Sequence, residues 1–195
     1  MPDIDIDFAD RERALSKFKH VKASRVEDNN LTKHNTGVYF HEVPLNAEKN
    51  LCAVEYDKAE DELGYFKVDF LNVSLYNDVR DEEHLNKLME REPLWELLEY
   101  QEFSDQLFHV AGHSQILQIM KPTTVEQLAA VLAMIRPAKR HLIGKPWNDI
   151  MQSVWEKPSD GSYYFKKSHA TAYALGVVVH MNLICEKISA QSAGS

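Results

Sequence analysis

The sequence predicts an α+β protein, with a small, largely acidic sheet in its first half and a helical second half. Before residue 80, apolar and polar residues alternate in several short runs, which is the period of β-strands. From residue 81 onward, apolar residues recur at the three- and four-residue spacing of helices. We therefore divide the chain into residues 1–80 and residues 81–195.

Composition places the chain among globular proteins. It has 195 residues, of which 44% are hydrophobic and 27% are charged, which suits one domain or one domain with a small appendage. The net charge of −8 argues against a protein that simply coats DNA. Residues 1–109 carry −12 and residues 110–195 carry +4, a split that suits either a metal site beside a phosphate-contacting surface or two ordinary surfaces.

Compartment is predicted from what the sequence lacks. It has no apolar run long enough to cross a membrane and no start typical of a signal peptide, so we expect a cytoplasmic protein without a membrane partner. Cys52 and Cys185 lie far apart and lack the spacing of metal ligands, which predicts two reduced thiols.

The first predicted strand is the alternating run 3–8. Two isoleucines and Phe8 would face one side, and Asp3, Asp5 and Asp7 would face the other. Three carboxylates on one strand face repel each other, and Asp is unfavourable in strands. A bound divalent metal or a basic side chain would compensate for both. The alternative is an acidic edge strand exposed to water.

The rest of the first half is predicted to alternate between short elements. We expect a helix over 9–26, a polar turn over 27–30, strands over 38–40 and 51–56, an acidic turn over 57–62 and a strand over 64–71. In that last strand Lys67 and Asp69 share a face. A carboxylate in so apolar a strand indicates either a salt bridge to Lys67 or a functional site.

The second half is predicted to be built from capped helices. Asp81 would cap a helix through Met89, and Pro93 would begin another. The run 123–126 resembles a capping box and opens a helix that stops at Arg136. Further helices are expected from Pro146, and from a cap at Ser168 to near Ile188.

Five stretches, in order along the chain, resemble the C-family replicative polymerases, the alpha subunits of bacterial DNA polymerase III. The run 2–8 matches the family's Pro-Asp-x-Asp-x-Asp-Phe, and 33–38 is similar to its Gly-Lys-His-Ala-Gly-Gly stretch. The run 64–71 resembles Gly-Leu-Val-Lys-Phe-Asp-Phe-Leu, 107–137 resembles the fingers segment, and 165–175 is close to Phe-Asn-Lys-Ser-His-Ala-Ala-Ala-Tyr-Ala-Leu.

The resemblance implies a polymerase beta-like nucleotidyltransferase palm over residues 1–80 and helical fingers packed on it over residues 81–195. It implies that Asp5, Asp7 and Asp69 are catalytic and bind two Mg²⁺ ions, with Mn²⁺ as a substitute. Asp3 would be auxiliary, although the alternation alone does not say which two of the three N-terminal aspartates bind metal. Lys67, Arg136 and Lys167 would contact the nucleotide or template; the alternatives are a charge partner of Asp69, a helix-terminal charge and a solvated lysine. His169 would cap the first turn of the last helix or contact phosphate, and the structural role is preferred.

The sequence also departs from the family. The Gly-Arg-Gly-Ser segment that grips the triphosphate is not found, and Arg-Pro-Gly-Pro is replaced by the run 136–139. We expect a minimal polymerase core that acts on primer–template DNA and dNTPs with a second polymerase fragment or a replisome protein. A compact phage genome, and hence the host cytoplasm, would be a natural setting. The alternatives are a non-catalytic remnant that binds DNA or the replisome, and a two-metal enzyme that uses the same carboxylates on another substrate.

Overall fold

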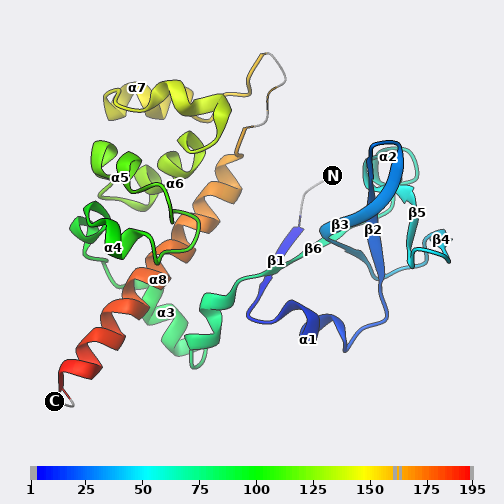
Figure 1. Ribbon diagram of the computed structural model, residues 1–195, viewed down its shortest axis with the longest axis horizontal. Helices are drawn as coiled ribbons and strands as arrows, with labels where there is room; N and C mark the ends of the chain where they lie inside the picture. The colour runs from blue at the N-terminus through cyan, green and yellow to red at the C-terminus, as the bar shows by residue number, and fades with distance from the viewer. Residues whose placement is uncertain (1–3, 160–161, 163, 194–195) are drawn as a thin grey trace. The chain divides into compact units, whose positions relative to one another are not determined.

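Two units make up the chain, Met1–Asn77 and Asp78–Ser195, and each is described by itself (Figure 1). The structure is a computed structural model that describes residues 4–159, 162 and 164–193. The boundary between the units falls three residues before the one expected from the sequence. The architecture is α+β, as predicted, because the first unit holds a sheet and the second is helical.

The first unit is built on a mixed six-stranded sheet with the strand order β1-β6-β3-β2-β5-β4. Its strands are β1 (Ile4–Phe8), β2 (Val21–Glu27), β3 (Asn30–Tyr39), β4 (Leu45–Asn46), β5 (Leu51–Glu55) and β6 (Val68–Asn72). A short helix, α1 (Arg11–Leu15), follows β1, and a second, α2 (Tyr56–Asp61), follows β5. The 3₁₀-helix η1 (Ser74–Asp78) leads out of the sheet.

The strand β1 lies at one edge of this sheet and pairs with β6 in parallel. The two strands are separated by about 60 residues in the sequence, so a crossover through β2 to β5 connects them, as parallel pairing requires. By contrast, β2 and β3 form an antiparallel hairpin whose turn residues Asp28 and Asn29 have φ values of 48° and 61°. Asp and Asn tolerate this left-handed conformation, which is why the predicted polar turn forms here.

Each face of the sheet is covered by a different helix. On one face, Leu15 of α1 packs with Val38, Val68 and Phe70, and Phe8 stacks on Phe70 with ring centroids 4.5 Å apart. On the other face Ala59 of α2 packs with the buried residues Ala23, Tyr39 and Cys52. Because side chains alternate along a strand, the aspartates of β1 and β6 lie on the second face, away from α1.

Four predictions in this unit differ from the structure. The strand expected over 38–40 is the longer β3, which begins at Asn30 and ends at Tyr39. The strand expected over 64–71 begins only at Val68, so Lys67 lies just before β6.

The helix expected over 9–26 ends at Leu15, and β2 begins at Val21. The segment from Val21 joins the sheet because β3 and β5 pair with it on its two sides and supply its backbone hydrogen bonds. The segment expected to form an acidic turn over 57–62 is instead the helix α2. Burial of Ala59 against the sheet stabilises this helix.

The second unit contains six α-helices and two 3₁₀-helices within its described residues. They are α3 (Glu82–Glu90), η2 (Trp95–Glu99), α4 (Gln101–Ser104), α5 (Ser114–Met120), α6 (Val125–Met134), η3 (Pro137–Leu142), α7 (Trp147–Ser153) and α8 (Lys167–Ala193). The helix α8 has 27 residues and is the long orange-to-red helix of Figure 1. It packs against α6 and α3, and every residue of α6 from Leu128 to Met134 is buried.

The capping predictions in this unit had mixed outcomes. Asp81 accepts a hydrogen bond from the backbone N–H of His84 at 2.8 Å and begins α3, as predicted. Thr124 caps α6 by accepting from the N–H of Gln127, which confirms the predicted start of this helix. The prediction for Ser168 is wrong, because α8 begins at Lys167 and continues to Ala193. The helix expected from Pro93 is instead the 3₁₀-helix η2.

The length and hydropathy of a helix determine whether it can span a membrane. Within the described residues, none of the helices combines the length and the apolar character that a bilayer crossing needs.

Candidate functional site

The two predicted catalytic strands lie side by side. Asp5 and Asp69 are Cα register partners in the parallel pair of β1 and β6. Neighbouring parallel strands lie about 4.8 Å apart, and side chains of register partners point to the same face. Asp7 follows two residues later on that face. The fold therefore brings together Asp5, Asp7 and Asp69, which we call the carboxylate face. Asp3 lies outside the described residues.

Charge repulsion is evident within the carboxylate face. Partial burial of its carboxylate and the negative charge of Asp5 raise the pKa of Asp7 above its ordinary value. A hydrogen bond from the hydroxyl of Tyr76 in η1 opposes this rise. Burial and the same carboxylate raise the pKa of Tyr76, so its proton stays on the hydroxyl. Asp5 and Asp7 are exposed, and this face is open to solvent at β1.

Asp69 differs from the two exposed β1 aspartates because its carboxylate is enclosed by neighbouring side chains. Lys67 donates from Nζ to its Oδ2, and the hydroxyl of Thr36 donates to its Oδ1 at 2.7 Å. The Lys67 residue is only 8% exposed. Its ammonium also lies 5.7 Å from the ring centroid of Tyr56, within the range of a cation–π contact. Of the two interpretations open from the sequence, the salt bridge is thus present.

His34 stands beside this pair as a neutral ring. Its Nδ1 accepts hydrogen bonds from the backbone N–H groups of Gly37, at 2.8 Å, and Thr36, at 3.3 Å. Burial lowers the pKa of His34, Asp69 opposes the shift, and Lys67 adds to it. The 3.7 Å between His34 Nδ1 and Asp69 Oδ1 is therefore not an ion pair, because Nδ1 carries no proton. The His34 ring therefore does not neutralise the charge of Asp69, and Lys67 does.

Gly37 makes room for the lysine. It is the register partner of Asp69 on β3, and a Cβ atom at this position would lie 2.6 Å from Cδ of Lys67 and 2.9 Å from Nδ1 of His34. The Lys67 stem can therefore lie flat on the β3 backbone only because residue 37 has no side chain.

Arg11 holds the same segment of β3 from the α1 side. Its guanidinium is buried and donates to the carbonyl oxygens of Asn35 and Thr36. Its backbone N–H donates to the side chain of Asn72 at the end of β6, at 3.0 Å. These bonds fix Thr36, and so the hydroxyl that contacts Asp69, relative to β6.

The donor types of the carboxylate face suit Mg²⁺ or Mn²⁺, which prefer carboxylate oxygens. The side-chain arrangement does not fit such an ion as it stands. Among the residues described, no three Asp, Glu, His or Cys side chains converge closely enough to hold a metal ion. Asp69 is also engaged already, because its Oδ1 accepts a hydrogen bond from Thr36 and its Oδ2 accepts one from Lys67.

Arg136 and Lys167 belong to the helical unit. The Arg136 guanidinium lies 5.1 Å from the ring centroid of Phe165, which stacks on Tyr173 at 5.5 Å. Lys167 begins α8 and lies 4.0 Å from Glu126, an exposed pair that contributes little to stability. Arg136 therefore lies over the ring of Phe165, and Lys167 follows Phe165 by two residues in the sequence. His169 lies 6.3 Å from the same ring, centroid to centroid.

A strained histidine adjoins this group. His109 has a left-handed φ of 61°, and its ring lies 4.1 Å from that of Tyr173. Burial, with a smaller contribution from the positive charge of Arg136, lowers the pKa of His109 to about 4. Burial, Arg136 and Arg140 also lower the pKa of His113. Both rings are neutral at pH 7, so the charge of Arg136 is not repelled by them.

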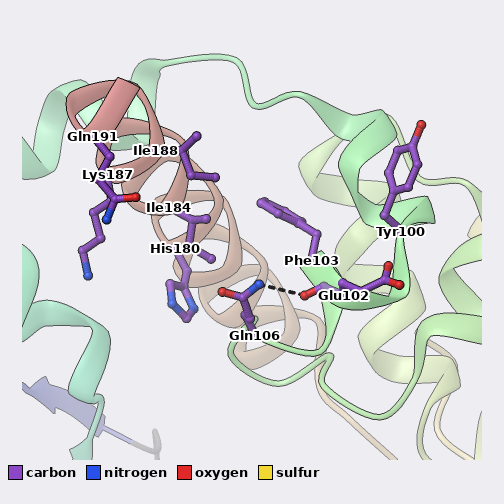
Figure 2. Close-up of a pocket in the computed structure, with 9 residues that line it drawn as sticks. All are labelled: Tyr100, Glu102, Phe103, Gln106, His180, Ile184, Lys187, Ile188 and Gln191. Carbon is purple, nitrogen blue, oxygen red and sulfur yellow. Dashed lines mark hydrogen bonds between the residues drawn. The ribbon is translucent and has the colours of Figure 1, made fainter. Parts of the chain in front are cut away.

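A separate hollow of about 560 Å³ lies between α4 and the C-terminal part of α8 (Figure 2). Phe103 points toward Ile184 and Ile188 across it, and polar side chains form its rim. Lys187 on that rim is paired with Asp78 at 2.8 Å. None of its nine lining residues was singled out as a site residue in the sequence.

Sequence reasoning missed the residues that support the carboxylate face. Thr36, Gly37 and His34 fall in the stretch 33–38, whose similarity to a family motif was the only signal that they matter. The sequence contains no sign of the hydrogen bond from Tyr76 to Asp7, because a lone tyrosine after a strand is unremarkable.

Comparison with known proteins adds nothing to this site, because no protein-family model, no curated protein and no solved structure matches the chain.

Proposed function

We propose that the chain is the core of a metal-dependent nucleotidyltransferase of the C-family polymerase kind, which extends a primer 3′-hydroxyl. The observation that carries the proposal is the register of Asp5 with Asp69, with Asp7 on the same face. Two aspartates of one strand beside a third on its neighbour is the carboxylate set that the sequence resemblance implies. In this proposal the sheet unit serves as the palm and the helical unit as the fingers.

Divalent ions bound to such carboxylates would activate the attacking hydroxyl and neutralise the leaving pyrophosphate. The chain's own residues would divide the other tasks. Asp5 and Asp7 are exposed to solvent and would bind the ions. Lys67, which is paired with Asp69, would supply a positive charge to a phosphate oxygen. Arg136 and Lys167, beside the Phe165 ring, would contact the nucleotide or template strand by charge and stacking.

Thermal unfolding with and without Mg²⁺ or Mn²⁺ tests the metal requirement. We expect either ion to raise the melting temperature of the wild type, because binding to the folded state alone stabilises it. Asp5→Ala and Asp69→Ala should abolish the rise. Asp28→Asn is the matched control, since this exposed turn residue lies away from the carboxylate face and Asn accepts its left-handed φ. If neither the wild type nor Lys67→Met responds to either ion, the metal site is rejected.

Primer extension with labelled dNTPs tests the reaction itself. It should be run on the purified chain and again with any protein that co-purifies with it. We expect Mg²⁺-dependent extension in at least one of the two, and loss of extension in Asp5→Ala and Asp69→Ala. Metal binding without extension in either preparation would reject polymerase activity.

A second candidate is a non-catalytic protein that binds DNA or the replisome. The observation in its favour is the enclosed Lys67–Asp69 pair, which ties up one of the three carboxylates. This candidate predicts salt-dependent DNA binding that is the same with and without divalent metal, and the same in Asp5→Ala as in the wild type.

A further inference from the structure

We propose that the ammonium of Lys67 is the built-in cation of the carboxylate face, and that it competes with a divalent metal ion for Asp69. This inference rests on the proposed metal-dependent function, because it describes how the same site is kept closed. It accounts for the disagreement between the carboxylate set, which suits a divalent ion, and the arrangement of the described side chains, which does not hold one.

The first support is the way in which Lys67 is held. The residue is 8% exposed, although lysine usually lies in solvent. Its stem lies on the β3 backbone at Gly37, where a Cβ atom would come within 2.6 Å of Cδ. Its ammonium is placed between the Asp69 carboxylate and the Tyr56 ring. Because contacts hold both its stem and its ammonium, Lys67 has a defined position in the site.

The second support is the occupancy of Asp69. Thr36 donates to Oδ1 and Lys67 donates to Oδ2, so each oxygen has already accepted one hydrogen bond. A divalent ion needs lone pairs of the same oxygens at about 2.0–2.1 Å for Mg²⁺. An ammonium at hydrogen-bonding distance from the same carboxylate would also repel the ion strongly. The ion and the Lys67 ammonium therefore compete for the Asp69 carboxylate.

Direct Mn²⁺ titration of the full chain, followed by electron paramagnetic resonance of the free ion, tests the competition. Lys67→Met keeps the stem and removes the charge, and we expect it to bind Mn²⁺ at least tenfold more tightly than the wild type. Lys67→Arg keeps the charge and should show no such gain. Lys33→Met, at an exposed lysine of β3, is the matched control and should stay within about twofold of the wild type. Adding Asp69→Asn to Lys67→Met should abolish the gain.

The outcomes separate this inference from the function on which it rests. If the wild type binds Mn²⁺, Asp5→Asn weakens that binding and Lys67→Met leaves it unchanged, competition is rejected and the carboxylate site stands. If neither the wild type nor Lys67→Met binds Mn²⁺, the metal site and the competition both fail.

A measurement on the wild type covers the case in which Lys67→Met does not fold. Mn²⁺ should expose the Lys67 amine to acetylation by an amine-reactive reagent, as followed by peptide mass spectrometry. We expect labelling of Lys67 to rise severalfold with Mn²⁺ while labelling of Lys33 is unchanged. Equal protection of Lys67 with and without bound Mn²⁺ would overturn the proposal.

Discussion

The side-chain amide of Asn182 in α8 donates a 2.9 Å hydrogen bond to the carbonyl oxygen of Leu88 in α3. The same nitrogen donates to the carbonyl oxygen of Arg91, also at 2.9 Å. The last carbonyl groups of a helix lack partners within it, and a buried one must find a partner elsewhere. One buried side chain of α8 thus caps the end of a helix 94 residues away in the sequence.

Asn182→Leu should lower the free energy of unfolding by about 2–3 kcal/mol, because it removes two hydrogen bonds and leaves buried carbonyl groups unpaired. Urea denaturation followed by circular dichroism measures the change. The control is Asn86→Leu, the same substitution at an exposed position of α3. It should stay within about 0.5 kcal/mol of the wild type. Equal losses in the two variants would contradict the capping role.

Asp5→Asn should stabilise the metal-free protein slightly, by less than about 1 kcal/mol, since the pair is solvent-screened. The pKa of Asp7 is raised in the folded state, so folding is penalised at pH values above that pKa and the penalty disappears as pH falls through it. Removing the Asp5 charge should lower the pKa of Asp7. Carboxyl chemical shifts followed by NMR across the acidic pH range would show it, and an unchanged Asp7 titration would contradict the repulsion.

Gly37→Ala should destabilise the sheet unit by about 1–3 kcal/mol, the usual cost of overpacking. The added methyl group would meet the Lys67 stem at 2.6 Å and the His34 ring at 2.9 Å, so both must shift. Thermal unfolding measures the loss. A melting temperature equal to that of the wild type would show that Lys67 is not held against β3.

Gly176→Ala, the same substitution at another position, should stabilise the protein, whereas Gly37→Ala should destabilise it. Gly176 lies within α8, and a Cβ atom there would meet the Phe108 ring at 3.4 Å, an ordinary contact. Alanine is favoured over glycine inside a helix by about 0.5–1 kcal/mol. We therefore expect a small gain in unfolding free energy by urea denaturation. A loss would mean that the Phe108 ring packs too tightly on the α8 backbone to admit a methyl group.

His109→Asn should flatten the acid limb of the pH–stability profile. The folded pKa of about 4 lies below the ordinary value of 6.5, so between these values the unfolded chain binds the proton and the folded one does not. Stability due to this group is therefore complete above pH 6.5 and is lost as pH falls toward 4, with a slope of at most about 1.4 kcal/mol per pH unit.

Asn suits this test because it tolerates the left-handed backbone of residue 109 without titrating. Unfolding free energies of the wild type and His109→Asn should be compared at about pH 8 and about pH 5, on either side of the ordinary histidine pKa. The wild type should lose more stability than the variant between the two. Parallel profiles would contradict the lowered pKa.

Combined Arg136→Ala and Lys167→Ala substitutions test whether the helical unit binds nucleic acid. Both are expected to lower affinity for primer–template DNA and to reduce the salt dependence of binding by about one counterion for each phosphate that the variant no longer neutralises. Fluorescence anisotropy at several salt concentrations measures this. Lys145→Ala, at an exposed lysine of the same unit, serves as the control. Unchanged binding would remove the nucleotide-contacting assignment of Arg136 and Lys167.

Local signals in the sequence were sufficient where the physics is local. The side chains of Asp81 and Thr124 cap the next helices through bonds to residues three positions on, and both starts were predictable. The two-residue period also placed Lys67 and Asp69 on one face. The helical spacing of apolar residues was misleading at 16–26. Phe18 and Val21 lie at that spacing, but β2 begins at Val21 and pairs with β3 and β5 in the sheet.

The arrangement of the candidate site required information that is not local. The register of Asp5 with Asp69 joins strands about 60 residues apart, and only the complete sheet order fixes it. The resemblance to a known family anticipated the grouping, whereas periodicity alone did not. Gly37 was a residue within a motif, and its actual task, leaving space for the Lys67 stem, depends on packing across two strands.

The long helix α8 determines when the helical unit can fold during synthesis. Its residues Ala170, Ala174, Val177 and Met181 belong to the core that encloses α6. Until the ribosome has released these residues, the apolar surface of α6 lacks its main cover. The sheet unit is free of this delay, since all six of its strands are made within the first 72 residues. During synthesis, the apolar surface of α6 is therefore left uncovered until α8 has emerged.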